Sequence, residues 1–242
     1  MNPDGARTLV VGCDWAGRSA PEELLGERER AHAAGLSGGR RAEWVRTRLT
    51  AKAAVRWATG VPGAQILPGP GGAPLLWGAP PGLVVSLAHS GHLAACAVGY
   101  GEPGRPVVGV DVEPVDARNG ILLKRLLGPD ETPCVVPGRP RRPLPPGLLA
   151  TVLAACKEAA LKAYRGPSPS LRDYPLSRGA DGRLRVRVAG ARHGELRVWW
   201  SCRAGRVTAV CAPGRLPPVR RTVPADRVLA ALRDARPRPP EH

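Results

Sequence analysis

The sequence predicts an α+β fold made of two similar α+β halves, with a ligand cleft between them. In each half a long helical segment precedes a terminal apolar strand, and the strand GHLAACA at residues 91–97 has an echo in GRVTAVC at residues 205–211. Self-similarity of this kind is typical of a duplicated unit, and ligands often bind between two packed units. Chance resemblance of two Ala- and Val-rich strands is the competing interpretation.

The first half is expected over residues 1–105. Period-2 and helical spacing of apolar residues, separated by Gly- and Pro-rich stretches, define its elements. In order they are a strand (residues 7–13), a short helical stretch (21–34), a long helix (40–59), a loop (60–82) and two strands (83–87 and 93–100) joined by a tight connection.

The second half is expected over residues 106–213. It is predicted to contain a strand (residues 107–115), a short helix followed by a proline-rich loop (128–147), a helix (148–165) and three antiparallel strands (184–188, 195–201 and 207–212). Residues 214–242 are predicted to form a proline-rich tail with a short amphipathic helix over 226–234.

Composition indicates a folded protein that attracts polyanions. The chain has 242 residues, 43% of them hydrophobic, which is enough for a substantial core. Its net charge of +16 favours nucleic acid, an anionic membrane, nucleotide-like substrates or an acidic protein as partner. Nucleic-acid modules place cations beside stacking aromatic residues, whereas the six Trp and three Tyr are scattered. Nucleic-acid binding is therefore the less favoured interpretation.

The cysteines and the N-terminus indicate the compartment. Six cysteines show no CxxC spacing, and several lie in apolar runs, which predicts buried free thiols in a reducing compartment. The apolar patch at residues 9–11 is too short for a signal sequence or a membrane span. We expect a soluble, cytoplasmic protein that does not bind a membrane.

Two carboxylates alternate along the predicted strand at 107–115. In the string VVGVDVEP, Asp111 and Glu113 fall on one face, about 7 Å apart. Carboxylates crowded on one face repel each other unless a cation lies between them. The flanking valines suggest burial and favour a metal site, although a solvated strand end would show the same alternation.

The helix at 148–165 adds a third carboxylate. Lys157 and Lys162 are two of only four lysines in the Arg-rich chain and bracket Glu158. Glu158 and Lys162 fall together on one side of a helical wheel. Alone, they would be interpreted as an exposed i,i+4 ion pair. Together with Asp111 and Glu113 they give an oxygen-rich set suited to Mg²⁺ and a phosphate-bearing substrate.

His89, in the segment SLAHSGH at 86–92, follows an apolar strand. The remaining histidines give no zinc-binding spacing. His89 is therefore interpreted as a donor to phosphate, with a plain turn histidine as the alternative.

Taken together, these motifs resemble the Sfp-type 4'-phosphopantetheinyl transferases. The match consists of SLAHS at 86–90, GVDVE at 109–113 and KEAALK at 157–162, in the family's order and approximate spacing, and it covers roughly residues 7–213. An Arg-rich helix near the front, RRAEWVRTR at 40–48, is also similar to the family's N-terminal half.

The resemblance implies a pseudo-twofold fold with coenzyme A bound between the halves. It further implies Mg²⁺ held by Asp111, Glu113 and Glu158. The implied contacts to the coenzyme are basic residues, with Lys162 and His89 on its phosphates and the arginines around its 3'-phosphate: Arg28, Arg40, Arg41, His89, Lys157 and Lys162.

The implied reaction moves phosphopantetheine from coenzyme A to a serine of an apo carrier protein. Glu158 is the candidate general base and Lys162 the group that stabilises the leaving phosphate. Carrier proteins of this kind are usually acidic, which suits the charge of +16. Two fused halves make a monomer the simpler expectation.

Three positions depart from the family pattern. Alanine stands at 73, 88 and 154, where family members carry the Lys of a GKP-like segment, a Ser before the His, and a Trp. A weakened homologue that binds coenzyme A or the carrier without turnover is therefore one alternative. A basic nucleic-acid module and an Mg²⁺-dependent phosphodiesterase are the others.

Overall fold

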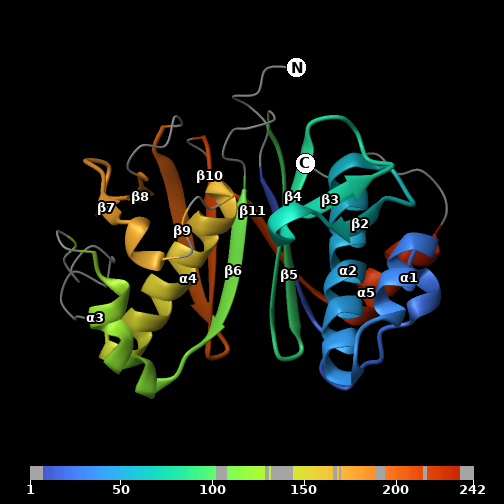
Figure 1. The fold of residues 1–242 in the computed structure, drawn as a ribbon, viewed down its shortest axis with the longest axis horizontal. Coiled ribbons are helices and arrows are strands. Elements are labelled where there is room, and N and C mark those ends of the chain that lie inside the picture. Colours follow the sequence, from blue (N-terminus) through green and yellow to red (C-terminus); the bar gives the residue numbers. More distant parts are fainter. Residues whose placement is uncertain are drawn as a thin grey trace. The chain divides into compact units, whose positions relative to one another are not determined.

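The computed structural model divides into two compact units, which are described one at a time. Unit 1 consists of Met1–Pro103 and Pro217–His242, and unit 2 consists of Gly104–Leu216. The structure describes residues 8–101, 108–128, 131, 144–165, 168, 170–188, 194–214 and 217–234. Each unit combines a sheet with helices (Figure 1), so the predicted α+β class is confirmed. The symmetry and the cleft between halves stay predictions.

Unit 1 is built on a four-stranded sheet with the order β11-β1-β5-β4. Strands β4 and β5 form the expected hairpin, and β1 pairs antiparallel with β5. The helices of this unit lie against the sheet or against one another (Figure 1). The elements are β1 (Leu9–Asp14), α1 (Glu27–Ala34), α2 (Gly38–Thr59), β2 (Gln65–Pro68), β3 (Pro74–Trp77), β4 (Leu83–Ser90), β5 (Leu93–Tyr100), β11 (Val219–Pro224) and α5 (Ala225–Arg233).

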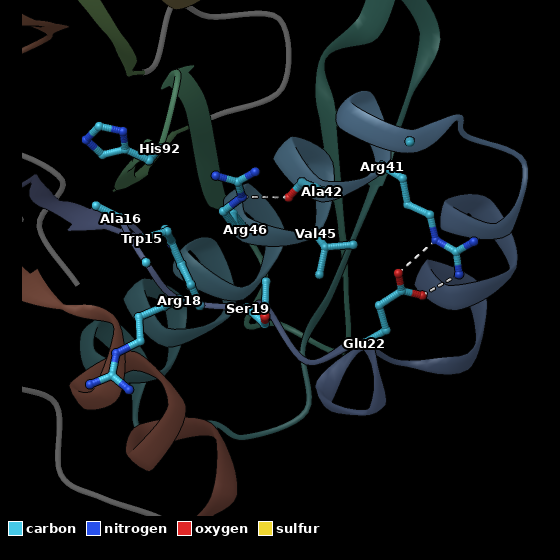
Figure 2. Close-up of a pocket in the computed structure, with 13 residues that line it drawn as sticks. Trp15, Ala16, Arg18, Ser19, Glu22, Arg41, Ala42, Val45, Arg46 and His92 are labelled. Atoms are coloured by element: carbon cyan, nitrogen blue, oxygen red, sulfur yellow. Dashed lines mark hydrogen bonds and ion pairs between the residues drawn. The ribbon is translucent and has the colours of Figure 1, made fainter.

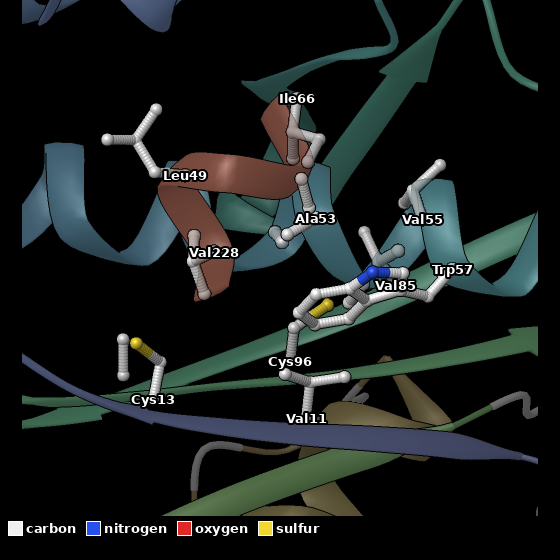
Figure 3. Close-up of a cluster of buried hydrophobic side chains, with 14 of the residues drawn as sticks. Val11, Cys13, Leu49, Ala53, Val55, Trp57, Ile66, Val85, Cys96 and Val228 are labelled. Atoms are coloured by element: carbon white, nitrogen blue, oxygen red, sulfur yellow. The ribbon is translucent and has the colours of Figure 1, made fainter. Parts of the chain in front are cut away.

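The core of unit 1 lies between α2 and the sheet, as Figure 3 shows. Leu49 of α2, Val11 of β1 and Cys96 of β5 are fully buried there. Alanines at positions 51, 53 and 54 of α2 are also buried, and their small side chains allow the helix to lie close to its neighbours. Val228 of α5 closes the cluster, so the C-terminal helix belongs to this core.

Two predictions for unit 1 need correction. Residues 217–234 do not form a separate tail, because β11 pairs in parallel with β1 and α5 packs against α2. The segment 60–82 is not all loop, because β2 and β3 pair antiparallel within it. Its frequent Gly and Pro hid two four-residue strands, which a tight turn with Gly71 at φ 66° connects.

Unit 2 is built on a five-stranded antiparallel sheet with the order β6-β10-β9-β8-β7. Helix α4 packs on β6 and β10 and buries Leu153, Cys156 and Ala160. The helix begins at Pro146, where proline suits a first turn. The elements are β6 (Gly109–Pro114), α3 (Leu123–Leu126), α4 (Pro146–Tyr164), β7 (Leu176–Arg178), β8 (Leu184–Val186), β9 (Leu196–Arg203) and β10 (Arg206–Ala212).

Two further predictions can be compared with the described residues. The cysteines there are free thiols, and four of them, at positions 13, 96, 156 and 211, are buried as expected. Cys134 and most of the predicted loop at 128–147 lie outside the described residues. In the described part of the chain no helix combines the length and the apolar character needed to cross a bilayer.

Candidate active site

The predicted carboxylates and lysine gather in unit 2, where β6 meets α4. Asp111 and Glu113 lie on β6, and Glu158 and Lys162 lie on α4. Lys162 Nζ donates to Asp111 Oδ1 at 2.7 Å and to the Val110 carbonyl at 3.2 Å. The tertiary fold thus joins two motifs that are far apart in the sequence.

A glycine makes this close approach possible. A Cβ at Gly109 would lie 1.8 Å from the carbonyl oxygen of Ala159, and 2.8 Å from the Ala163 nitrogen. All of these neighbours are backbone atoms of α4, so no side-chain rotation could relieve the clash. The glycine of GVDVE, Gly109, is therefore a contact position between the strand and the helix that carry the site.

Two carboxyl groups of the cluster, those of Glu113 and Glu158, have raised pKa values. Burial, then the Asp111 and Glu158 carboxylates, raises the pKa of Glu113 to about 7, and Lys162 opposes the rise. Burial and then Asp111 also raise the pKa of Glu158, again opposed by Lys162. Three acidic groups thus share one lysine, so the cluster attracts additional positive charge, whether from protons or from a metal cation.

Asp111 is the most buried member of the cluster, with 6% of its surface exposed. Its Oδ2 is buried and has no hydrogen-bond partner in the part of the chain that the structure describes. A protonated Glu113 can donate to the Asp111 carboxylate, and this hydrogen bond is among the causes that raise the pKa of Glu113; an ionised Glu113 can only accept. A hard cation with oxygen ligands suits such a donor set. Among the same residues, however, no three His, Cys, Asp or Glu side chains are already arranged around a metal position.

Lys157, which the resemblance assigns to the coenzyme, does not join this cluster. Its side chain is fully buried, and Nζ donates to Glu131 Oε2 at 2.5 Å. Because Lys157 precedes Glu158 by one residue, it points to a different side of α4. The sequence motif therefore combines one buried structural position with two positions of the site.

The predicted arginines and histidine lie in unit 1. Arg41 lines a pocket of about 680 Å³ together with Arg46, Trp15 and His92 (Figure 2). Arg41 forms a two-pronged ion pair with Glu22, at 2.7 Å and 2.6 Å. The Nε of Arg46 donates to the Ala42 carbonyl, and its guanidinium has no acidic partner among the described residues. The pocket therefore offers a cation to an anionic ligand.

The remaining predicted contacts are on the surface of unit 1. The guanidinium of Arg28 stacks 4.3 Å above the Trp77 ring. Arg40 is exposed in the first turn of α2, and His89 is exposed near the end of β4. None of these three side chains lies in the pocket that contains Arg41.

Sequence reasoning missed three residues that the structure places at or behind these sites. Arg46 and His92 line the pocket of unit 1, and Glu131 is the buried partner of Lys157. Arg46 could have been found, because it lies in the Arg-rich segment RRAEWVRTR at 40–48 that the resemblance already singled out. His92 comes from the turn between β4 and β5, and Glu131 lies outside the described helices and strands, so no periodic pattern identified them.

The fold and the site define an α+β protein with an acidic cluster and a lysine suited to phosphate chemistry. Residues 27–99 match the family model of the 4'-phosphopantetheinyl transferase N-terminal domain. This match confirms the predicted resemblance to the 4'-phosphopantetheinyl transferases, and it covers the part of the chain from residue 27 to residue 99.

Structural comparison finds a holo-ACP synthase from Plasmodium yoelii. This enzyme is 20% identical, with a TM-score of 0.36, over 46% of this chain and 97% of that chain. A comparison with curated proteins gives no match.

Proposed function

We propose that the protein transfers the 4'-phosphopantetheine arm of coenzyme A to a serine of an apo carrier protein and releases 3',5'-ADP. The observation that carries this proposal is the meeting of Asp111, Glu113, Glu158 and Lys162 at the β6–α4 contact. The family match of residues 27–99 supports the same reaction class. We place the chemistry in unit 2, because its cluster contains both a base and a cation.

The carboxylates would hold Mg²⁺, with Asp111, Glu113 and Glu158 as ligands directly or through water. The metal, when bound, would neutralise the diphosphate of coenzyme A and orient it for displacement. The unpartnered Oδ2 of Asp111 and the raised pKa values of the two glutamates support this assignment, because each indicates that additional positive charge would stabilise the ionised carboxylates.

Glu158 would accept the proton of the attacking serine. Its pKa is raised, chiefly by burial, which brings it closer to the range in which a carboxylate is an effective base near neutral pH. The serine oxygen forms a bond to the phosphorus of the phosphopantetheine group, and the bond from that phosphorus to the leaving 3',5'-ADP breaks. Lys162 would stabilise the negative charge on the departing phosphate.

Unit 1 would bind the phosphates of the coenzyme through its cations. Arg41 and Arg46 of the pocket are the strongest candidates, because guanidinium groups form paired hydrogen bonds to phosphate. Arg28, Arg40 and His89 are exposed, so they are accessible to such a ligand. The alanines at 73, 88 and 154 would remove contacts found elsewhere in the family, and we expect a weaker coenzyme affinity from them.

The partner we propose is an acidic acyl or peptidyl carrier protein met in the cytoplasm by a monomeric enzyme. The charge of +16 would speed this encounter by electrostatic steering. We do not assign nucleic acid as a partner.

Intact-mass spectrometry of an apo carrier protein tests the proposal. The carrier is incubated with this protein, coenzyme A and Mg²⁺, and we expect a mass gain equal to one phosphopantetheine arm that EDTA abolishes. Glu158→Gln should remove the gain while leaving the fold intact. Glu23→Gln is the matched control, because it makes the same change at an exposed position in unit 1.

Other outcomes would point to the alternatives. Coenzyme A binding without any mass gain on several carriers would favour a weakened, non-catalytic homologue. Release of 3',5'-ADP without a carrier would favour a phosphodiesterase. Normal turnover by Glu158→Gln would show that another group accepts the serine proton.

A further inference from the structure

The two units repeat one order of elements. Unit 1 runs β1, α1, α2, β2, β3, β4, β5, and unit 2 runs β6, α3, α4, β7, β8, β9, β10. The pairing of the central strands also repeats, as β1-β5-β4 in one unit and β6-β10-β9 in the other. Unit 1 also contains β11 and α5, which have no counterpart among the described residues of unit 2.

Inside this repeat, each unit buries one lysine of its long helix against one glutamate. In unit 1 Lys52 Nζ donates to Glu29 Oε2 at 2.9 Å, with side-chain exposures of 7% and 0%. In unit 2 Lys157 Nζ donates to Glu131 Oε2 at 2.5 Å, with exposures of 0% and 1%. The two pairs occupy matching places in the order of elements, between the long helix and the segment before it.

The hydrogen bonds of the two glutamates match as well. Glu29 accepts the N–H of Gly26, three residues earlier, at 2.8 Å, and Glu131 accepts the N–H of Gly128, three residues earlier, at 3.0 Å. The second oxygen of Glu29 accepts an N–H at 2.7 Å from Ile66 of β2. The second oxygen of Glu131 accepts an N–H at 2.8 Å from Leu176 of β7, the strand that follows the long helix in unit 2.

Stability alone does not account for such a pair. A buried ion pair loses hydration that its attraction only partly offsets, and apolar replacements of similar volume are often as stable or more so. Each pair does hold its neighbouring segments in a defined geometry, because both oxygens of the carboxylate accept hydrogen bonds from specific donors. The pair in unit 1 therefore connects the start of α1, the long helix α2 and strand β2, and the pair in unit 2 connects the residue after the C-cap of α3, the long helix α4 and strand β7.

In unit 1 this arrangement is connected to Arg28 through Gln65 and Trp77. The N–H of Arg28 donates to Gln65 Oε1 at 3.2 Å, and Gln65 pairs across the β2–β3 ladder with Trp77, on which the Arg28 guanidinium stacks. Gln65 precedes Ile66, whose N–H is held by Glu29. Lys52 also donates to the Ala64 carbonyl at 2.7 Å, so the pair holds β2 from two sides.

We infer that Glu29 and Lys52 are positioning residues that fix α1 against β2 and thereby hold Arg28 where it binds an anionic substrate. The inference rests on the proposed function for the role of Arg28 in binding and for the identity of that substrate, coenzyme A. The equivalent pair in unit 2, Glu131 with Lys157, positions α4, which carries Glu158 and Lys162. Loss of the first pair should therefore affect binding of the coenzyme, and loss of the second should affect turnover.

Paired neutral substitutions test this division. The double variant Glu29→Gln/Lys52→Met removes both charges of unit 1, and Glu131→Gln/Lys157→Met is its matched control in unit 2. We expect the first to raise the KM for coenzyme A about tenfold, the effect of one lost charged hydrogen bond, with kcat unchanged. We expect the second to lower kcat with the KM unchanged.

Combining the unit 1 double variant with Arg28→Ala shows whether the change in KM is transmitted through Arg28. If Glu29 and Lys52 act through Arg28, adding Arg28→Ala to the double variant raises the KM no further. Hydrogen exchange should become faster at the amides of Gly26 and Ile66 and stay as in the wild type at those of Gly128 and Leu176. An unchanged KM in a folded double variant, or a fully additive effect of Arg28→Ala, would overturn the inference.

A failure of the proposed function can be distinguished from a failure of this inference. If the wild-type protein transfers nothing to any carrier, the same variants are compared by calorimetric binding of coenzyme A. Weaker binding that is not additive with Arg28→Ala still supports the positioning role. Absence of coenzyme A binding by the wild-type protein would overturn it.

Discussion

Gly109→Ala should damage both stability and activity, because it acts on the contact that assembles the acidic cluster. The added Cβ would lie 1.8 Å from the Ala159 carbonyl oxygen. An ordinary contact between such atoms exceeds 3 Å, so β6 and α4 must separate by more than about 1 Å. Backbone atoms form the whole obstacle, and the strand cannot yield without moving Asp111.

The magnitude follows from the two consequences of that movement. Overpacking a closely packed contact costs about 1–3 kcal/mol, and we expect the upper end because no side chain can adjust. The ion pair between Lys162 and Asp111, at 2.7 Å, would lengthen to nearly 4 Å. A misplacement of about 1 Å among catalytic groups can cost about a hundredfold in rate.

Gly12→Ala is the matched control, since it makes the same change in a strand of unit 1. A Cβ at Gly12 would have its nearest neighbours at 4.0 Å, an ordinary contact. Urea unfolding would measure stability, and transfer to an apo carrier would measure kcat. The reasoning is refuted if Gly109→Ala unfolds within about 0.5 kcal/mol of Gly12→Ala and retains its kcat.

Two further predictions concern buried charge. Lys157→Met should lower the free energy of unfolding by about 3–5 kcal/mol in urea titrations, because it leaves the Glu131 carboxylate buried without a counter-ion. Glu131→Gln/Lys157→Met should recover most of that loss, and equal losses in the two variants would contradict the account. Burial, chiefly, raises the pKa of Glu113 from 4.5 to about 7, so the folded state binds this proton more tightly than the unfolded chain. Without divalent metal, stability should therefore decline as pH rises from about 4.5 to about 7, by at most about 3 kcal/mol, and Glu113→Gln should remove this decline. A pH dependence that Glu113→Gln leaves unchanged would assign the titration to another group.

The sequence predicted most of the elements because their signals are local. The helical spacing of apolar residues in α2 and α4, the apolar run of β5 and the alternation in β6 follow from which side chains a helix or strand buries. The prediction failed for β2, β3 and β11, whose short strands are stable only when paired with partners. The supposed tail shows this most clearly, because β11 pairs with β1 at the other end of the chain.

The sequence alone also determined the candidate chemistry. GVDVE and KEAALK identified Asp111, Glu113, Glu158 and Lys162 because the chemistry requires those residue types at fixed spacing along a strand and a helix. Only the tertiary structure decided that Lys157, adjacent to Glu158, is buried against Glu131, and that Lys52 repeats this arrangement in the other unit. A side chain's neighbours across the fold determine its burial and its counter-ion, and these neighbours come from distant parts of the chain.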